Sequence, residues 1–206
     1  MKICGITRVE DAVAAIRCGA DALGFVFWPR SPRFVSPDEA RDIIASVPQT
    51  VAKVGVFVNQ SADEVNAAAD RAGVTMVQLH GDESPAYAAG ISRPVIKSIS
   101  GRPGALVPAG WAADVIWLVD AHDPERRGGT GRQADWSAAA ALAASHKVLL
   151  AGGLTPANVG DAIASVRPFG IDVSSGVESA PGIKDRELLL ALFGAIHGVT
   201  GHQARS

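Results

Sequence analysis

Short apolar runs recur along the whole chain and alternate with signals for helix starts. Each run is rich in Val, Ile, Leu and Phe at consecutive positions, which predicts strands buried on both faces, as in a parallel sheet. Eight such runs are present, and they span Lys2 to Cys4, Ala22 to Phe27, Val51 to Val58, Met76 to His80, Val95 to Ile99, Val115 to Asp120, Val148 to Ala151 and Ile171 to Val173.

Most of the predicted strands are followed within a few residues by a helix start. Two segments, Ser36-Pro37-Asp38-Glu39 and Ser61-Ala62-Asp63-Glu64, place a glutamate at the capping-box position after a serine. Simpler caps are predicted at Ser84-Pro85, at Thr155-Pro156, at Asp135 and at Thr7, the last with Glu10 completing a box.

Eight strand and helix units in 206 residues predict an α/β fold of the (βα)8 TIM-barrel type, with eight parallel strands in a closed barrel and helices outside. We expect one domain over residues 1–206, with residues 198–206 forming a polar, frayed tail. An open doubly wound sheet is the alternative fold. It normally carries a GxGxxG dinucleotide motif, and no such motif follows any predicted strand.

Composition narrows the functional class. The 19 basic and 21 acidic side chains give a net charge of -2, which favours neither nucleic acid nor an anionic membrane as a partner. The two cysteines, Cys4 and Cys18, form no CxxC motif, so neither a disulfide framework nor a zinc site is predicted. Without a signal-type or membrane-spanning apolar segment, we expect an unexported cytoplasmic protein.

In a barrel of this type the active site lies at the carboxyl ends of the strands. Cys4 ends the first predicted strand, and Asp120 ends the sixth. A lone cysteine is often only a small buried apolar residue. An aspartate directly after a buried strand emerges at the barrel mouth or pairs with a cation, because an unpaired buried charge is costly. Both residues are candidates for proton transfer.

Other polar residues lie at the same end of the predicted barrel. Arg33 follows Ser31-Pro32 and is either a surface arginine or a clamp for a planar carboxylate. His80 and Gln78 end the fourth strand, where a hydrogen-bonded supporting role for His80 is favoured over catalysis. Asp172 lies in the eighth strand.

Small residues occupy the loops after the seventh and eighth strands, where barrels often bind phosphate through backbone N–H groups. The alternative is that these glycines only turn the chain. The candidate phosphate-binding residues are Gly152, Gly153, Ser174, Ser175 and Gly176. A separate glycine-rich segment, Gly128-Gly129-Thr130-Gly131, is predicted to form a lid. It is not a nucleotide P-loop, because Arg132-Gln133 replaces the required Lys and Ser/Thr pair.

The chain resembles the phosphoribosylanthranilate isomerase family over essentially its whole length. The resemblance rests on ordered motifs, namely Lys2-Ile3-Cys4-Gly5-Ile6-Thr7, Gly24-Phe25-Val26-Phe27, Ser36-Pro37, Val54-Gly55-Val56-Phe57-Val58, Val77-Gln78-Leu79-His80-Gly81, Gly128-Gly129-Thr130-Gly131, Gly152-Gly153-Leu154 and Asp172-Val173-Ser174-Ser175-Gly176-Val177-Glu178.

The resemblance implies an Amadori rearrangement of N-(5-phosphoribosyl)anthranilate in tryptophan biosynthesis, without cofactor or metal. Cys4 matches the family's general base and Asp120 its general acid. Arg33 matches the contact to the anthranilate carboxylate, and Asp172 is a further candidate ligand contact. At the reference pKa of about 8.5, only roughly 3% of a cysteine is thiolate at pH 7. We therefore expect helix ends and a nearby cation to favour the Cys4 thiolate.

Two other functions stay open from the sequence. One is a Schiff-base aldolase acting on a phosphosugar through Lys53 or Lys97, and the other is a phosphosugar-binding barrel without catalysis. The apolar segment Leu188 to Phe193 packs either on the barrel or on a second copy, so a monomer is favoured over a homodimer only on balance.

Overall fold

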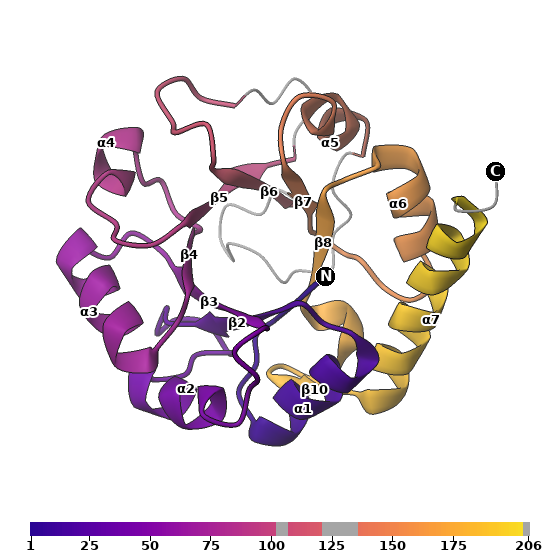
Figure 1. The fold of residues 1–206 in the computed structure, drawn as a ribbon, viewed down its shortest axis with the longest axis horizontal. Helices are drawn as coiled ribbons and strands as arrows, with labels where there is room; N and C mark the ends of the chain where they lie inside the picture. Colours follow the sequence, from indigo (N-terminus) through magenta and orange to yellow (C-terminus); the bar gives the residue numbers. More distant parts are fainter. Residues whose placement is uncertain (102–106, 121–135, 204–206) are drawn as a thin grey trace.

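The computed structural model describes residues 1–101, 107–120 and 136–203, without the side chains of residues 199–203. Eight parallel strands close into a barrel in sequence order, which confirms the predicted fold (Figure 1). The strands are β1 (Lys2–Cys4), β2 (Ala22–Val26), β3 (Ala52–Phe57), β4 (Met76–Leu79), β5 (Val95–Ser100), β6 (Ile116–Asp120), β7 (Val148–Leu150) and β8 (Gly170–Val173).

Closure of the barrel brings the two ends of the sheet together. β1 pairs in parallel with β2 on one side and with β8 on the other, and the register places Lys2 beside Asp172. The same pairing places Cys4 beside Gly24. Residues from opposite ends of the sequence therefore share one wall of the barrel.

Seven α-helices of the described chain cover the outside of the barrel (Figure 1). Ser36, Ser61 and Ser84 each accept a hydrogen bond from the backbone three residues on, and the first two complete capping boxes, as predicted. The helices are α1 (Val9–Cys18), α2 (Pro37–Ile44), α3 (Ala62–Ala72), α4 (Pro85–Ala88), α5 (Trp136–Ala143), α6 (Val159–Val166) and α7 (Arg186–Gln203).

Two predicted caps are wrong. The N-cap of α1 is Arg8, which makes no side-chain cap, while the Thr7 hydroxyl donates instead to the Gly182 carbonyl at 2.6 Å. After Thr155 the chain first makes a turn, and α6 begins only after Asn158. In that turn the Asn158 side chain accepts from the Thr155 N–H at 2.8 Å. At Thr7 a tertiary contact takes the hydroxyl that the local pattern assigned to a cap, and at Thr155 a turn delays the start of the helix. The cap predicted at Asp135 lies outside the described residues.

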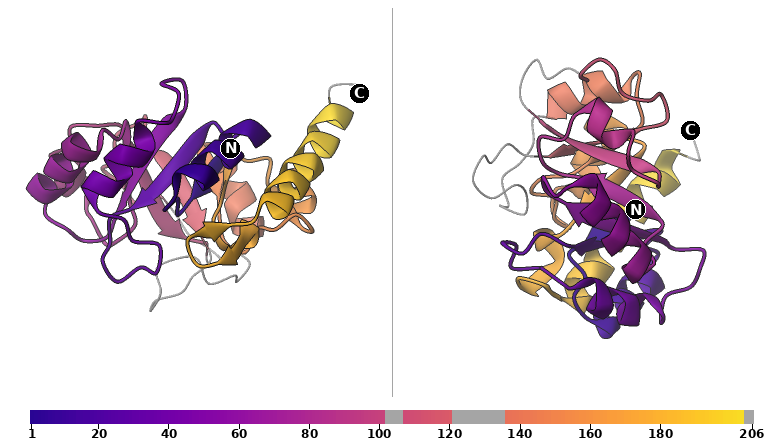
Figure 2. Two further views of the ribbon diagram at one scale, coloured as in Figure 1. Left: turned by 90° about the horizontal axis from the view of Figure 1, so that it is seen from below. Right: turned by 90° about the vertical axis from the view of Figure 1, so that its left-hand side faces the viewer.

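The end of the chain also differs from the expectation. Residues 198–203, predicted as a frayed tail, continue α7, whose C-terminal end projects away from the barrel (Figure 2). A short antiparallel hairpin precedes α7 and was not predicted. Its strands are β9 (Glu178–Ala180) and β10 (Ile183–Lys184), and Gly182 turns between them with a φ of 81°.

The apolar core has two layers. The larger lies between the outer face of the strands and the helices, and the α7 side chains Leu189, Leu192 and Phe193 are buried in it. A smaller cluster inside the barrel includes Val54 and Leu118 and closes the barrel below the mouth. Among the residues described, no helix combines the length and apolar character needed to span a bilayer.

Candidate active site

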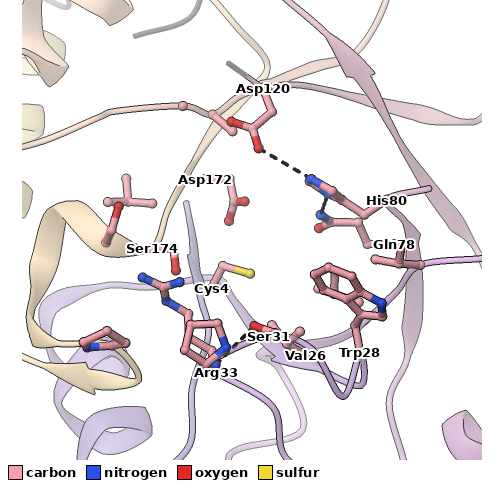
Figure 3. Close-up of a pocket in the computed structure, with 18 of the residues that line it drawn as sticks. Cys4, Val26, Trp28, Ser31, Arg33, Gln78, His80, Asp120, Asp172 and Ser174 are labelled. Atoms are coloured by element: carbon pink, nitrogen blue, oxygen red, sulfur yellow. Dashed lines mark hydrogen bonds and ion pairs between the residues drawn. The ribbon is translucent and has the colours of Figure 1, made fainter. Parts of the chain in front are cut away.

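A cavity of about 790 Å³ opens at the carboxyl ends of the strands (Figure 3). It is lined by every predicted site residue that the structure describes: Cys4, Arg33, Gln78, His80, Asp120, Gly152, Gly153, Asp172, Ser174, Ser175 and Gly176. The predicted lid, residues 128–131, lies outside the described residues. The barrel thus brings together residues that are as far apart in sequence as Cys4 and Gly176.

Cys4 is the last residue of β1, and its sulfur points into the cavity (Figure 3). The residue is only 8% exposed. Its neighbour on β2 is Gly24, where an added Cβ would lie 2.7 Å from the Cys4 Sγ. Gly24 therefore provides the space that the thiol occupies, which explains why a glycine is needed inside an otherwise apolar strand.

The electrostatic environment of Cys4 differs from the one predicted. Burial raises the pKa of the Cys4 thiol, and this effect exceeds the opposing influence of the Lys2 and Lys184 ammonium groups. The Asp172 carboxylate raises the pKa further. Cations are therefore present beside the thiol, as expected, but they do not bring its pKa below the ordinary value. Desolvation of the thiolate outweighs them.

Asp120 faces the cavity from the end of β6, on another side of the mouth from Cys4 (Figure 3). Its Oδ2 lies 3.5 Å from Nε2 of His80. The other ring nitrogen of His80, Nδ1, is 2.8 Å from Nε2 of Gln78. Gln78, His80 and Asp120 thus form a chain of polar contacts along the cavity wall.

Asp172 projects into the cavity from β8 and is paired from below. Nζ of Lys2 lies 2.8 Å from Oδ1 of Asp172, and both side chains are buried. Burial alone lowers the pKa of Lys2, but Asp172 and Cys4 together raise it above its ordinary value, so Lys2 is a buried cation. Sequence reasoning assigned no role to Lys2, although its place two residues before Cys4 in a strand puts both on the same face.

Arg33 lies at the mouth with its guanidinium held by Glu178 at 2.6 to 3.1 Å. Glu178 also accepts from Nζ of Lys184 at 2.6 Å, and the same ammonium donates to the carbonyls of Cys4, at 2.6 Å, and Ser174, at 3.3 Å. Sequence reasoning gave Glu178 and Lys184 no function. Both belong to the unpredicted hairpin, and nothing local indicated that it folds back onto the end of β1.

The loops after β7 and β8 together line one side of the cavity. Gly152 and Gly153 have φ values of 86° and 65°, which only glycine adopts readily. A Cβ on Gly176 would collide with the Leu154 carbonyl oxygen, so the two loops approach each other closely. These glycines serve the backbone path of both loops, and that path leaves the loops facing the cavity.

The two lysines of the aldolase alternative do not line the cavity. Nζ of Lys97 donates to the Gly81 carbonyl at 2.6 Å and to Glu83 at 2.8 Å, while Nζ of Lys53 donates to the Pro48 carbonyl at 2.7 Å. Neither amine is positioned to attack a bound sugar. Over the described part of the chain, no group of three or more His, Cys, Asp or Glu side chains is arranged to share a metal ion.

Comparison with known proteins identifies one family. Residues 1–195 match the family model described as N-(5'-phosphoribosyl)anthranilate isomerase. The protein of that name from Pelobacter propionicus is 48% identical over 186 residues, which are 90% of this chain and 89% of the relative.

Solved structures agree with the sequence relatives. The phosphoribosyl anthranilate isomerase of Thermus thermophilus superposes with a TM-score of 0.86 at 39% identity, covering 96% of this chain and 98% of that one. A second phosphoribosyl anthranilate isomerase structure, in complex with reduced 1-(o-carboxyphenylamino)-1-deoxyribulose 5-phosphate, gives a TM-score of 0.80 at 34% identity and covers 97% of both chains.

Proposed function

Because this chain belongs to the N-(5'-phosphoribosyl)anthranilate isomerase family, we propose that it carries out the family's reaction with Cys4 as general base and Asp120 as general acid. The activity is an isomerisation in tryptophan biosynthesis. It converts N-(5-phosphoribosyl)anthranilate into 1-(2-carboxyphenylamino)-1-deoxyribulose 5-phosphate by an Amadori rearrangement. Each step of this rearrangement can be assigned to a residue of the cavity.

The reaction begins at the ring oxygen of the ribose. Asp120 donates its proton to that oxygen, the bond from C1 to the ring oxygen breaks, and the anthranilate nitrogen supplies the electron pair that forms an iminium ion. The iminium acidifies the hydrogen on C2. The Cys4 thiolate takes this proton, and the electron pair left on C2 neutralises the iminium to give an enolamine.

The enolamine then becomes the ketone when the proton of its C2 hydroxyl is lost and C1 gains a proton. Asp120 regains a proton and Cys4 gives one up, so the enzyme returns to its starting state. The substrate provides its own electron sink in the iminium. The reaction then requires only an acid for the ring oxygen and a base for the C2 proton, and Asp120 and Cys4 reach one cavity from different sides.

Three other parts of the cavity are assigned to binding. Arg33 would contact the anthranilate carboxylate, since a guanidinium suits a planar anion. Val26, Trp28 and Val56 provide an apolar wall for the aromatic ring. The loops 152–153 and 174–176 would bind the phosphate through backbone N–H groups, and Asp172 is placed to reach a sugar hydroxyl.

One observation carries the assignment of acid and base: the Cys4 sulfur and the Asp120 carboxyl group reach a single cavity from β1 and β6 (Figure 3). Each is mostly buried, at 8% exposure. A closed environment favours directed proton transfer to substrate over exchange with bulk water.

The test measures the loss of phosphoribosylanthranilate fluorescence with Cys4→Ala and Asp120→Asn, with Cys18→Ala as the matched control. We expect each site variant to lose about 100-fold or more in kcat, the range typical for a general acid or base. The control should keep full turnover, and all three should keep native circular dichroism. Near-normal turnover in either site variant refutes the role of that residue. Turnover by the wild type also excludes the binding-only alternative.

We further propose a cytoplasmic monomer. Cys4 and Cys18 are both free thiols, as a reducing compartment maintains. Leu189, Leu192 and Phe193 of α7 are buried within the chain itself, which leaves Leu190 as the exposed leucine of that segment. Sedimentation velocity at micromolar concentration should give one species of 21.2 kDa. A species of twice that mass would show a homodimer.

A further inference from the structure

We propose that Lys2 is the buried cation that stabilises the Cys4 thiolate, and that its ion pair with Asp172 holds it in place beneath the sulfur. This inference rests on the proposed role of Cys4 as general base. A thiol enclosed in a mostly apolar wall needs a nearby positive charge to exist as the anion that removes the C2 proton. Lys2 would supply that charge without taking part in the proton transfers.

The geometry of β1 places Lys2 under Cys4. Residues two apart in a strand point to the same face, and a rise of about 3.3 Å per residue leaves a lysine side chain long enough to span the interval. Lys2 is 2% exposed, and the charge of its ammonium acts on the Cys4 thiol. Ile3, between them, faces the outer apolar layer.

The pairing of β1 with β8 then fixes the ammonium. The register places Lys2 directly beside Asp172, and Nζ of Lys2 lies 2.8 Å from Oδ1 of Asp172. A lysine has three N–H donors, and Asp172 takes one of them. A buried lysine without such a partner would lose its proton, because desolvation disfavours the charged form. The pair therefore keeps a positive charge in the barrel interior.

The other cations near Cys4 are hydrogen-bonded to carbonyl oxygens and to Glu178 rather than to the Cys4 sulfur. Lys184 of β10 donates to the Cys4 and Ser174 carbonyls and to Glu178, and Arg33 is held by Glu178. Asp172 itself opposes the thiolate. After burial, Lys2 has the largest influence on the Cys4 thiol, and it acts to lower the pKa.

This arrangement suits a base that must return to neutrality. With a neutral thiol, Lys2 and Asp172 balance each other. With a thiolate, Lys2, Asp172 and Cys4 together carry one net negative charge, which is neutralised when the sulfur accepts the C2 proton. The cation thus makes the thiolate accessible without making it so stable that it would no longer take the proton.

The experiment measures the rate of Cys4 alkylation by iodoacetamide against pH. Only the thiolate reacts, so the midpoint of the profile reports its formation. The parent is Cys18→Ala, which leaves Cys4 as the single thiol because the chain has two cysteines. Removing Lys2 as Lys2→Met should raise the midpoint by roughly 1 to 3 pH units, the shift typical of losing a neighbouring opposite charge. Lys2→Arg should restore most of the difference.

A second comparison covers the case in which Lys2→Met fails to fold because Asp172 is left unpaired. The double variant Lys2→Met/Asp172→Asn removes both charges of the pair together, so it leaves no unpaired buried charge. Because Lys2 acts on the Cys4 thiol more strongly than Asp172 does, the midpoint should be higher in the double variant than in the Cys18→Ala parent. The matched control is Lys97→Met, which removes another buried lysine, ion-paired at 2.8 Å to Glu83 outside the cavity, and should leave the midpoint unchanged.

An unchanged midpoint on removing Lys2, in variants with native circular dichroism, overturns the inference. The ascending limb of the kcat/KM profile should move with the alkylation midpoint, since that limb reports the base in the free enzyme. Failure of the base assignment looks different, because Cys4→Ala would then still turn over substrate. Alkylation could still shift in that case, which separates the two results.

Discussion

The Glu178 carboxylate accepts three hydrogen bonds from the Arg33 guanidinium, of 2.6, 2.9 and 3.1 Å. The two residues are 145 positions apart in the sequence, and the hairpin of β9 and β10 brings them together. Both side chains are largely buried, with 12% exposure for Arg33 and 4% for Glu178. A long arginine side chain is thereby held in one orientation at the mouth, in the position proposed to receive the substrate carboxylate.

Replacing Glu178 by Gln should weaken substrate binding more than it slows chemistry. The amide keeps the shape but loses charge-assisted hydrogen bonds, so Arg33 is no longer fixed before substrate arrives. We expect KM to rise about 10-fold, the equivalent of about 1.4 kcal/mol, with a smaller change in kcat. Steady-state kinetics measures both constants.

The control for this variant is Asp38→Asn. Asp38 also accepts a two-point contact from an arginine, Arg71, but on the exposed surface, and neither residue lines the cavity. Its kinetic constants should match those of the wild type. A KM for Glu178→Gln within twofold of wild type would show that Arg33 needs no support.

Glu178 should also make stability depend on pH. Burial raises the pKa of Glu178, but the hydrogen bonds from Arg33 and the Lys184 charge more than offset this, so its pKa in the folded protein lies below the ordinary 4.5. A carboxyl group with a lowered folded pKa contributes stability that is present above its unfolded pKa and is lost as the pH falls through the folded value.

The free energy of unfolding, measured by urea titration at several pH values, checks this sign. Glu178→Gln should be less stable than the wild type above pH 4.5, and the gap should close below it, because protonated Glu178 resembles the amide. A gap that stays constant or widens as the pH falls would contradict the lowered pKa.

Replacing Gly24 by Ala should displace the thiol of Cys4, the proposed general base. The added methyl would lie 2.7 Å from Sγ and 3.1 Å from Cα of Cys4, and the Cα cannot move without shifting β1. We expect kcat to fall about 10-fold or more, since small misplacement of a reacting group is costly. Circular dichroism should remain native.

Gly194→Ala is the matched substitution for comparison. Gly194 lies in α7, and nothing is within 4 Å of an added Cβ there. It should keep full activity and gain about 0.5 to 1 kcal/mol of stability, as alanine is the better helix former. Full activity in Gly24→Ala would mean that the thiol does not need its present position.

Borohydride treatment in the presence of substrate should leave every lysine unmodified. Lys97 is committed to Gly81 and Glu83, and Lys53 to Pro48, so neither amine faces the cavity. Intact-mass spectrometry after reduction should give the mass of the untreated chain. A stable adduct mapped to Lys97 or Lys53 would support the Schiff-base aldolase alternative.

Much of the barrel was determined by local sequence. The eight apolar runs became eight strands with no boundary shifted by more than one residue, and the capping boxes at Ser36 and Ser61 began helices as predicted. Cys4 and Asp120 were found because strand ends define the mouth of a barrel, so their neighbourhood followed from the strand count. These features depend on periodicity and backbone hydrogen bonding over a few residues.

The charge network around the site was decided only by the tertiary structure. Lys2 meets Asp172 because β8 closes onto β1, and Glu178 meets Arg33 because a hairpin too short to show a strand pattern folds back over the mouth. Thr7 lost its predicted cap to Gly182 for the same reason. Burial, which sets the direction of the Cys4 pKa, likewise depends on which distant segments pack around the thiol, and no local pattern contains that information.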